Sequence, residues 1–158
     1  MTILKTMLAS GVIALLSGSA MALTATQSVQ KEVTIVNSDG SSTVTYQPAD
    51  LVAPGERIIY SLYIENDDAQ PASNLVLTMP VPSEVKYIEG SAAKIGAAVT
   101  YSADQGESFS TRETLMVLAD SGVSRTASSE DITHIRWNIT GSIEAGASDS
   151  LSFTGELK

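Results

Sequence analysis

Apolar and polar residues alternate along much of the chain, and this period of two constrains the fold more than any other feature. Successive side chains of a β-strand point to opposite faces, so the alternation predicts strands with one buried face. In residues 57–65, one face carries four apolar side chains, namely Ile58, Tyr60, Leu62 and Ile64. No window shows a helical stripe of useful length. The chain is therefore predicted to be rich in β-structure.

Further strands with the same pattern are predicted along the rest of the chain. They cover residues 29–35, 44–46, 74–79, 85–89, 98–102, 113–118, 132–139 and 148–158. Eight or nine short strands with Gly, Pro, Asn and Asp between them predict an all-β fold, an antiparallel β-sandwich of one domain over residues 23–158. Trp137 is expected to be buried between the sheets with Tyr60 and Phe153. Residues 119–131, rich in Ser and Ala, are expected to form a long mobile loop.

A secretory signal peptide is predicted over residues 1–22. Lys5 is the only charged residue among the first 30, an apolar run covers residues 7–16, and Ala20 and Ala22 supply the small residues of a cleavage site. The run is about half of the roughly 20 residues that a membrane-spanning helix needs. We therefore expect cleavage after Ala22, export to the periplasm or the exterior, and no stable membrane insertion after the signal is removed.

The composition excludes several kinds of chemistry. The chain has no cysteine, which rules out disulfides, thiol catalysis and cysteine-ligated metals. Its formal net charge of −9 repels phosphate backbones, so we expect no nucleic-acid partner. A single histidine leaves little room for acid–base or metal chemistry based on imidazole.

Two groups of acidic residues are the candidate metal ligands. Glu65, Asp67 and Asp68 follow a predicted strand, and Asp104 and Glu107 flank a glycine. Calcium binds six to eight oxygen atoms, so such groups are compatible with a calcium site. They lack the spaced acidic positions of an EF-hand loop, and Asp is an ordinary turn residue. We interpret both groups as polar turns, and a calcium- or ligand-binding protein remains the first alternative.

No catalytic, cofactor-binding or metal-binding residue is predicted. His134 lies on the strand face opposite Trp137, and it is expected to face solvent rather than to belong to a triad. The sequence has no Gly-x-Ser-x-Gly motif. The chain is therefore expected not to be an enzyme and to need no cofactor. A small hydrolase with an unrecognised carboxylate site is the second alternative.

Several motifs occur in an order that points to one family. They are a Pro-Gly-acidic turn before a Tyr-containing strand that ends in Asn (53–66), an apolar strand into a Pro turn (72–82), Tyr-Ile-Glu-Gly-Ser (87–91), a turn with a trailing aromatic (101–109), a Trp strand (132–137) and a Gly turn (144–146). Together they resemble the bacterial conserved-repeat domain of surface and exported proteins, domain of unknown function eleven, over residues 44–157. The resemblance implies an immunoglobulin-like sandwich with structural or adhesive roles and no known catalytic residues.

These observations predict a non-enzymatic structural or interaction module of the bacterial envelope or exterior. Its expected partner is another envelope or extracellular protein. Exposed strand edges can accept a partner strand, and residues 148–157 are the candidate edge. The outward side chains on this strand are predicted to be Ser150, Ser152, Thr154 and Glu156.

Overall fold

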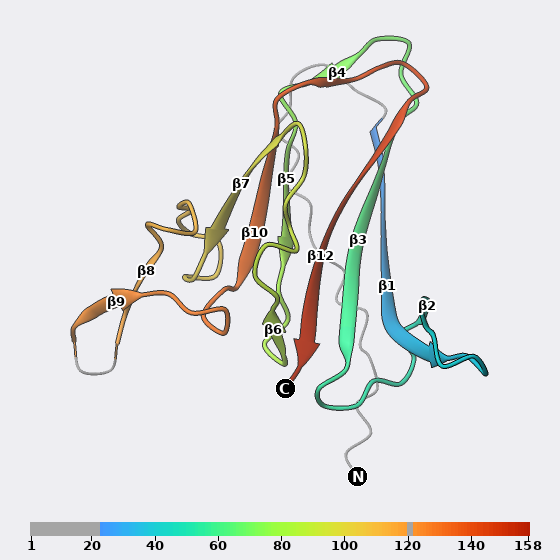
Figure 1. Ribbon diagram of the computed structural model, residues 1–158. Coiled ribbons are helices and arrows are strands. Elements are labelled where there is room, and N and C mark those ends of the chain that lie inside the picture. The colour runs from blue at the N-terminus through green and yellow to red at the C-terminus, as the bar shows by residue number, and fades with distance from the viewer. Residues whose placement is uncertain (1–22, 120–121) are drawn as a thin grey trace.

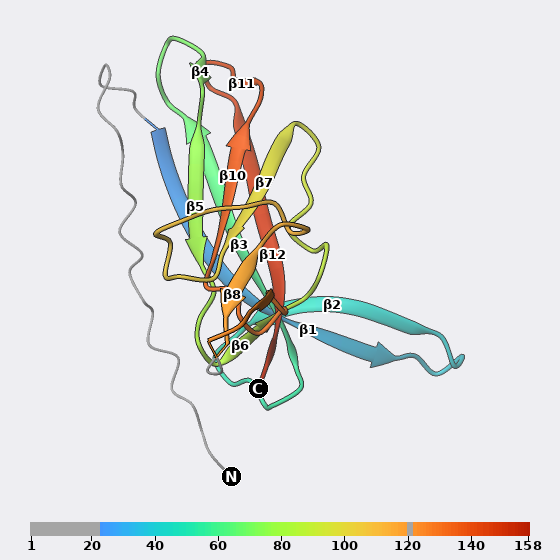
Figure 2. The ribbon, with the colours of Figure 1, turned by 90° about the vertical axis from the view of Figure 1, so that its left-hand side faces the viewer.

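The computed structural model describes residues 23–119 and 122–158, and these residues form antiparallel β-sheets without a helix. Figure 1 shows two facing layers, and Figure 2 views the same layers from the side of the smaller sheet. The predicted antiparallel β-sandwich is confirmed. The predicted signal peptide lies outside the described residues.

The larger layer is a five-stranded sheet with the strand order β2-β1-β3-β12-β6. Its strands are β2 (Ser42–Pro48), β1 (Leu23–Val36), β3 (Arg57–Asn66), β12 (Ser148–Leu157) and β6 (Val85–Tyr87). All neighbours in it are antiparallel. The strand nearest the C-terminus therefore lies inside the sheet, next to β3.

The smaller layer is a three-stranded sheet with the order β5-β10-β7. Its strands are β5 (Val76–Pro80), β10 (His134–Ile139) and β7 (Ala97–Ser102). Two short ribbons complete the described residues, one of β4 (Ala72–Ser73) with β11 (Ser142–Ile143) and one of β8 (Met116–Leu118) with β9 (Ser124–Thr126). Pro80 ends β5 at the border of this sheet, where a missing backbone donor is tolerated.

The core lies between the two layers, where the alternating residues of β3, β12 and β10 meet. Trp137 and Phe153 are fully buried, and Tyr60 is buried beside them in the sequence-predicted core. The Tyr60 and Phe153 rings stack with centroids 4.8 Å apart. The indole Nε1 of Trp137 donates a hydrogen bond to the Ala92 carbonyl at 2.9 Å. The predicted core is confirmed, and the buried N–H of Trp137 has a hydrogen-bond acceptor.

The predicted number of strands is too low, because the described residues contain twelve. The difference comes from pieces of two or three residues, too short for alternation to be read. Asn74 adopts a left-handed backbone with φ of 56°, which separates β4 from β5, and β4 lies just before the strand that was predicted over residues 74–79.

The prediction of a long mobile loop over residues 119–131 is wrong for the part that the structure describes. β9 lies within this segment and pairs with β8, which directly precedes it. Arg125 and Asp131 form an ion pair at 2.7 Å, and Ala127 is buried in the main core. The Ser- and Ala-rich composition contains no sign of this order. The segment is held by the β8–β9 pairing, by the Arg125–Asp131 ion pair and by the buried side chain of Ala127.

The β1–β2 ribbon, residues 32–47, projects from the sandwich. β1 pairs with β3 from Leu23 to Lys31 and with β2 from Gln30 to Val36. Beyond Lys31, β1 no longer pairs with β3, so the remaining residues of β1 pair only with β2. Figure 2 shows this ribbon extending away from both layers. Asn37 closes the tip by donating its side-chain amide to the Thr43 hydroxyl at 3.0 Å.

Candidate functional site

The first acidic group lies at the end of β3, and the side-chain oxygen atoms of Asp67 and Asp68 accept hydrogen bonds from nearby residues. Asn66 Oδ1 accepts a hydrogen bond from the Asp68 N–H at 3.1 Å. Asp67 Oδ2 accepts one from the Thr24 hydroxyl at 2.8 Å. Asp68 Oδ1 accepts one from the N–H two residues further on, and Glu65 points away from the core as an exposed residue. These bonds fix the strand end next to the start of β1.

Asn66 is the buried centre of this end of the molecule. Its side chain is fully buried. Its Nδ2 donates to the carbonyls of Gln70 and Ile143, each at 2.8 Å, and of Glu144 at 3.2 Å. Its backbone N–H donates to the Ala147 carbonyl at 2.9 Å. One amide therefore joins the end of β3 to the chain that leads into β12. The only sequence signal was its place at the end of an alternating strand.

The second acidic group lies at the end of β7, at the opposite end of the sandwich (Figure 1). Asp104 accepts hydrogen bonds from the Ser108 hydroxyl, from the Ser108 N–H at 2.9 Å and from the Ser102 hydroxyl at 2.7 Å. These bonds, those of Ser108 foremost, lower the pKa of Asp104 to about 2. Glu107 is exposed. In residues 23–119 and 122–158, no three Asp, Glu or His side chains gather as metal ligands would.

His134 is half-buried, which differs from the solvent-facing position predicted for it. Its ring lies beneath Gly106, and its Nδ1 is 3.2 Å from the Thr133 hydroxyl. Burial lowers the pKa of His134, although the charge of Asp104 opposes this. Next to it on the same face of β10, the Arg136 guanidinium lies 3.4 Å from the centre of the Phe109 ring. The segment after β7 therefore covers this face.

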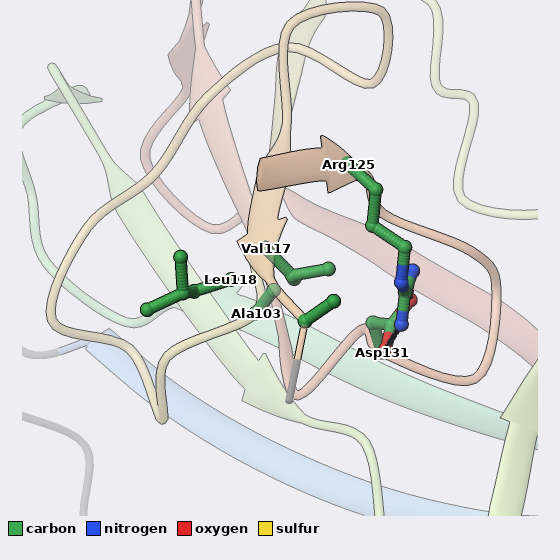
Figure 3. Close-up of a pocket in the computed structure, with 6 residues that line it drawn as sticks. Ala103, Val117, Leu118, Arg125 and Asp131 are labelled. Carbon is green, nitrogen blue, oxygen red and sulfur yellow. Dashed lines mark hydrogen bonds and ion pairs between the residues drawn. The ribbon is translucent and has the colours of Figure 1, made fainter. Parts of the chain in front are cut away.

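A shallow hollow of about 410 Å³ lies at the base of the β8–β9 ribbon. Figure 3 shows its apolar side chains beside an ion pair. The lining residues are Ala103, Val117, Leu118, Ala119, Arg125 and Asp131. Arg125 contacts both carboxylate oxygens of Asp131, at 2.7 and 2.8 Å, and Asp131 also accepts from Ser128. The charged groups of the hollow are directed at each other rather than toward a ligand position.

The ion pairs of this region predict acid sensitivity. The Arg112 guanidinium lowers the pKa of Glu89, and the Arg125 guanidinium lowers that of Asp131. A carboxylate whose pKa is lower in the folded state stabilises the fold above its unfolded pKa, and this contribution is lost as the pH falls. The ordinary values are 4.5 for Glu and 3.8 for Asp. We expect the melting temperature to fall progressively as the pH drops below about 4.5.

Melting curves at a series of pH values, followed by circular dichroism, check this expectation. Asp131→Asn removes one of the responsible carboxylates and should make the decline shallower by a few degrees. Glu130→Gln is the matched control, because Glu130 is an exposed neighbour whose nearest cation, Lys86, is 3.9 Å away. An Asp131→Asn curve parallel to that of the wild type down to the lowest pH would contradict the assignment.

The predicted edge strand is only partly an edge. β6 pairs with β12 at residues 155–157, and the Thr154 carbonyl accepts the Ile88 N–H at 2.9 Å. The prediction is therefore wrong for the C-terminal part of β12, which lies between two strands. It could not be seen in the sequence because β6 contributes only three residues, and these are far from β12 along the chain.

The first part of β12, residues 148–152, has an open edge. Alternate residues of a strand direct their backbone groups to opposite sides. Leu157 directs its N–H and C=O to the side of β3, and Thr154 directs its own to the other side. By the same alternation Ser152 faces away from β3, on a side where the described residues provide no strand. Ser150 and Ser152 are exposed.

This open edge is flanked by charge. The Lys94 ammonium is 2.5 Å from the Asp149 carboxylate. The same carboxylate accepts the Ser150 N–H at 2.7 Å. Ser152 therefore carries the clearest unpaired donor and acceptor of β12, and the Lys94–Asp149 pair limits how far along β12 a partner strand can extend.

No family model, no curated protein and no solved structure matches this chain. Among the described residues there is no helix of the length and apolarity required to cross a bilayer. What the protein does must therefore be argued from its own sequence and geometry.

Proposed function

We propose that this protein is an exported, non-enzymatic structural or interaction module of the bacterial envelope or exterior. The observation that carries the proposal is the open edge of β12 around Ser152, a backbone donor and acceptor presented beside exposed serines on a rigid sheet. Strand addition to such an edge provides main-chain hydrogen bonds to a partner protein. Export is inferred from the signal-like residues 1–22, and the envelope context from the resemblance to the conserved-repeat domain of surface proteins.

The carboxylates and the histidine that the structure describes elsewhere in the sandwich support a contact role over a catalytic one. Asp104, Asp131 and Glu89 all have their carboxylates engaged by serine hydroxyls or arginine. His134 is half-buried beside a threonine. A hydrolase would need a nucleophile, a base and a substrate position converging on one cleft. The observed pairs stabilise loops.

Affinity capture tests the proposal. The protein is expressed as the full chain, recovered from the periplasm or the medium, and used as bait on a native envelope extract. The bait should have its N-terminus at Leu23, and it should retain at least one envelope protein. Ser152→Pro removes the outward donor and should reduce that recovery at least tenfold.

Ser61→Ala is the matched control, because Ser61 lies opposite Ser152 on β3 but inside the sheet. Both variants must show the wild-type circular dichroism spectrum and a cooperative melt. Equal recovery by wild-type protein and Ser152→Pro would remove the β12 edge from the proposal. If no protein is recovered reproducibly, or if Met1 is intact on protein found outside the cytoplasm, the proposed function is wrong.

A further inference from the structure

The β1–β2 ribbon exposes apolar side chains that a solvated hairpin does not need. Ile35, Val36, Val44 and Tyr46 are each between 45% and 72% exposed. Between Val33 and Gln47 the only charged residue is Asp39, at the tip. An isolated two-stranded hairpin is at best marginally stable in water, and long uncharged edges pair readily with other strands. The ribbon thus has the composition of a strand pair that is covered when it functions.

β2 is the outermost strand of the larger sheet, and its backbone shows which residues face outward. The Ala49 N–H donates to the Val29 carbonyl, and the Ser41 carbonyl accepts the Asn37 N–H, so odd-numbered residues face β1. The even-numbered residues Ser42, Val44 and Tyr46 therefore direct N–H and C=O to the open side. Pro48, the next in this series, has no N–H to offer and ends the row of donors.

This outward row is self-complementary. If a second β2 runs antiparallel with Val44 opposite Val44, Ser42 lies opposite Tyr46 in both directions. Each residue of a hydrogen-bonded antiparallel pair exchanges both of its backbone bonds with its partner. Every outward donor from Ser42 to Tyr46 then meets an acceptor, and the pairing stops where Pro48 interrupts the row. In the register that pairs Val44 with Tyr46, Ser42 would lie opposite Pro48, which has no N–H, so the Ser42 carbonyl would lack a donor.

The side chains fit the same register. Residues that are paired across strands share a face, so Val36 beside Ser42 and Thr34 beside Val44 lie on the face that carries Tyr46. In the pairing centred on Val44, the two valines would touch. The ring of Tyr46 would lie beside Ser42 of the second copy, whose small side chain leaves it room to reach Val36. Three of the exposed apolar residues are covered on each copy.

We propose that the outer edge of β2 is a self-association site, at which a second copy of this chain adds its own β2 in antiparallel orientation, centred on Val44. Charge favours this edge over the others. Each copy has a formal net charge of −9, so two copies repel each other overall. Contact through an uncharged edge adds no further pair of like charges. The open side of β1 in the ribbon begins beside Glu32 and Arg57, 3.9 Å apart, and the β12 edge carries Lys94 and Asp149.

Single cysteines test the register, because the chain has none of its own. Val44→Cys places two thiols on directly opposed residues, whose Cα separation of about 5.5 Å suits a disulfide. Tyr46→Cys is the matched control on the same strand and face. In the proposed register its two copies are four residues apart along the strand, about 13 Å, which is beyond disulfide reach. Under mild oxidation, Val44→Cys should form a covalent dimer and Tyr46→Cys should not.

Sedimentation velocity over a range of protein concentrations tests the association itself. The wild-type protein should show a reversible monomer–dimer equilibrium. Val44→Lys places two ammonium groups opposite each other and should weaken the dimer at least tenfold, as should Val44→Glu with two carboxylates. An equimolar mixture of these two variants should dimerise again. Ser152→Pro, at the β12 edge, should dimerise like the wild type.

The outcomes separate this inference from the proposed function. A wild-type protein that stays monomeric at every concentration overturns the inference, and so does equal crosslinking of Val44→Cys and Tyr46→Cys. Dimers that Val44→Lys leaves intact also overturn it. Because the variants alter exposed residues, a melting curve like that of the wild type shows that each is folded. Capture of envelope proteins through Ser152 depends on a different edge and is judged separately.

Discussion

Trp137→Ala is expected to lower the free energy of unfolding by about 3–5 kcal/mol, a large share of the stability of a domain of this size. Trp137 is fully buried in the middle strand of the smaller sheet, between β5 and β7. Truncation removes its ring from the core and leaves a cavity, because packed sheets relax only partly into lost volume. It also leaves the Ala92 carbonyl without its indole donor. Urea unfolding followed by circular dichroism measures the loss.

Ile95→Ala serves as its control, because the Ile95 side chain is almost completely exposed and its removal should change stability by no more than about 0.5 kcal/mol. The wild-type protein offers an independent measurement, since Trp137 is its only tryptophan. Its emission should be blue-shifted and insensitive to iodide. Red-shifted emission that iodide quenches, or a loss of stability no greater than that of Ile95→Ala, would contradict the buried position.

Asn66→Asp is expected to cost about 3–5 kcal/mol at neutral pH, although it exchanges only an amide for a carboxylate. The Asn66 amide donates to three carbonyl oxygens in a fully buried position. A carboxylate there removes both donor hydrogens and directs a negative charge at acceptor atoms. The end of β3 would lose the hydrogen bonds that join it to residues 143 and 144, which precede β12.

The pH dependence of this variant has a definite sign. Burial among carbonyls raises the pKa of the introduced carboxyl above its unfolded value, so the neutral form is favoured in the folded state. The defect relative to the wild type should therefore shrink as the pH falls through the raised pKa, and it should be largest at neutral pH. Asp67→Asn, the reverse exchange at the exposed neighbour, is the control. A defect that is independent of pH, or no larger than that of Asp67→Asn, would refute the explanation.

The features that could be predicted from the sequence are those that follow from the alternation of apolar and polar side chains. Ile58, Tyr60, Leu62 and Ile64 lie buried on one face of β3, as their spacing requires, and Trp137 lies where its neighbours on β10 place it. Burial of one face of a strand is a local property, since it depends on which residues are apolar at every second position. It needs no knowledge of the partner strand.

The features that could not be predicted depend on which segments meet. β6, β8 and β9 have only three residues each, so nothing in their sequences indicates that β6 pairs with the end of β12 or that β8 pairs with β9. The buried hydrogen bonds of Asn66 involve carbonyls from distant parts of the chain. The open edges follow from strand order, so the part of β12 that is open around Ser152, and the outer edge of β2 at Val44, could be located only once the neighbours of these strands were known.

The position of β12 beside β3 has a consequence for how the protein folds. Leu62 pairs with Leu151, and Tyr60 with Phe153, so the interior of the larger sheet forms only after nearly the whole domain has been synthesised. Such long-range pairing makes folding slow, because loop closure must precede the gain from contacts. A chain still lacking β12 leaves one backbone edge of β3 unpaired and the core without Leu151 and Phe153. For the export that we propose, slow completion would be an advantage, because a chain that has not finished folding is still able to cross a membrane.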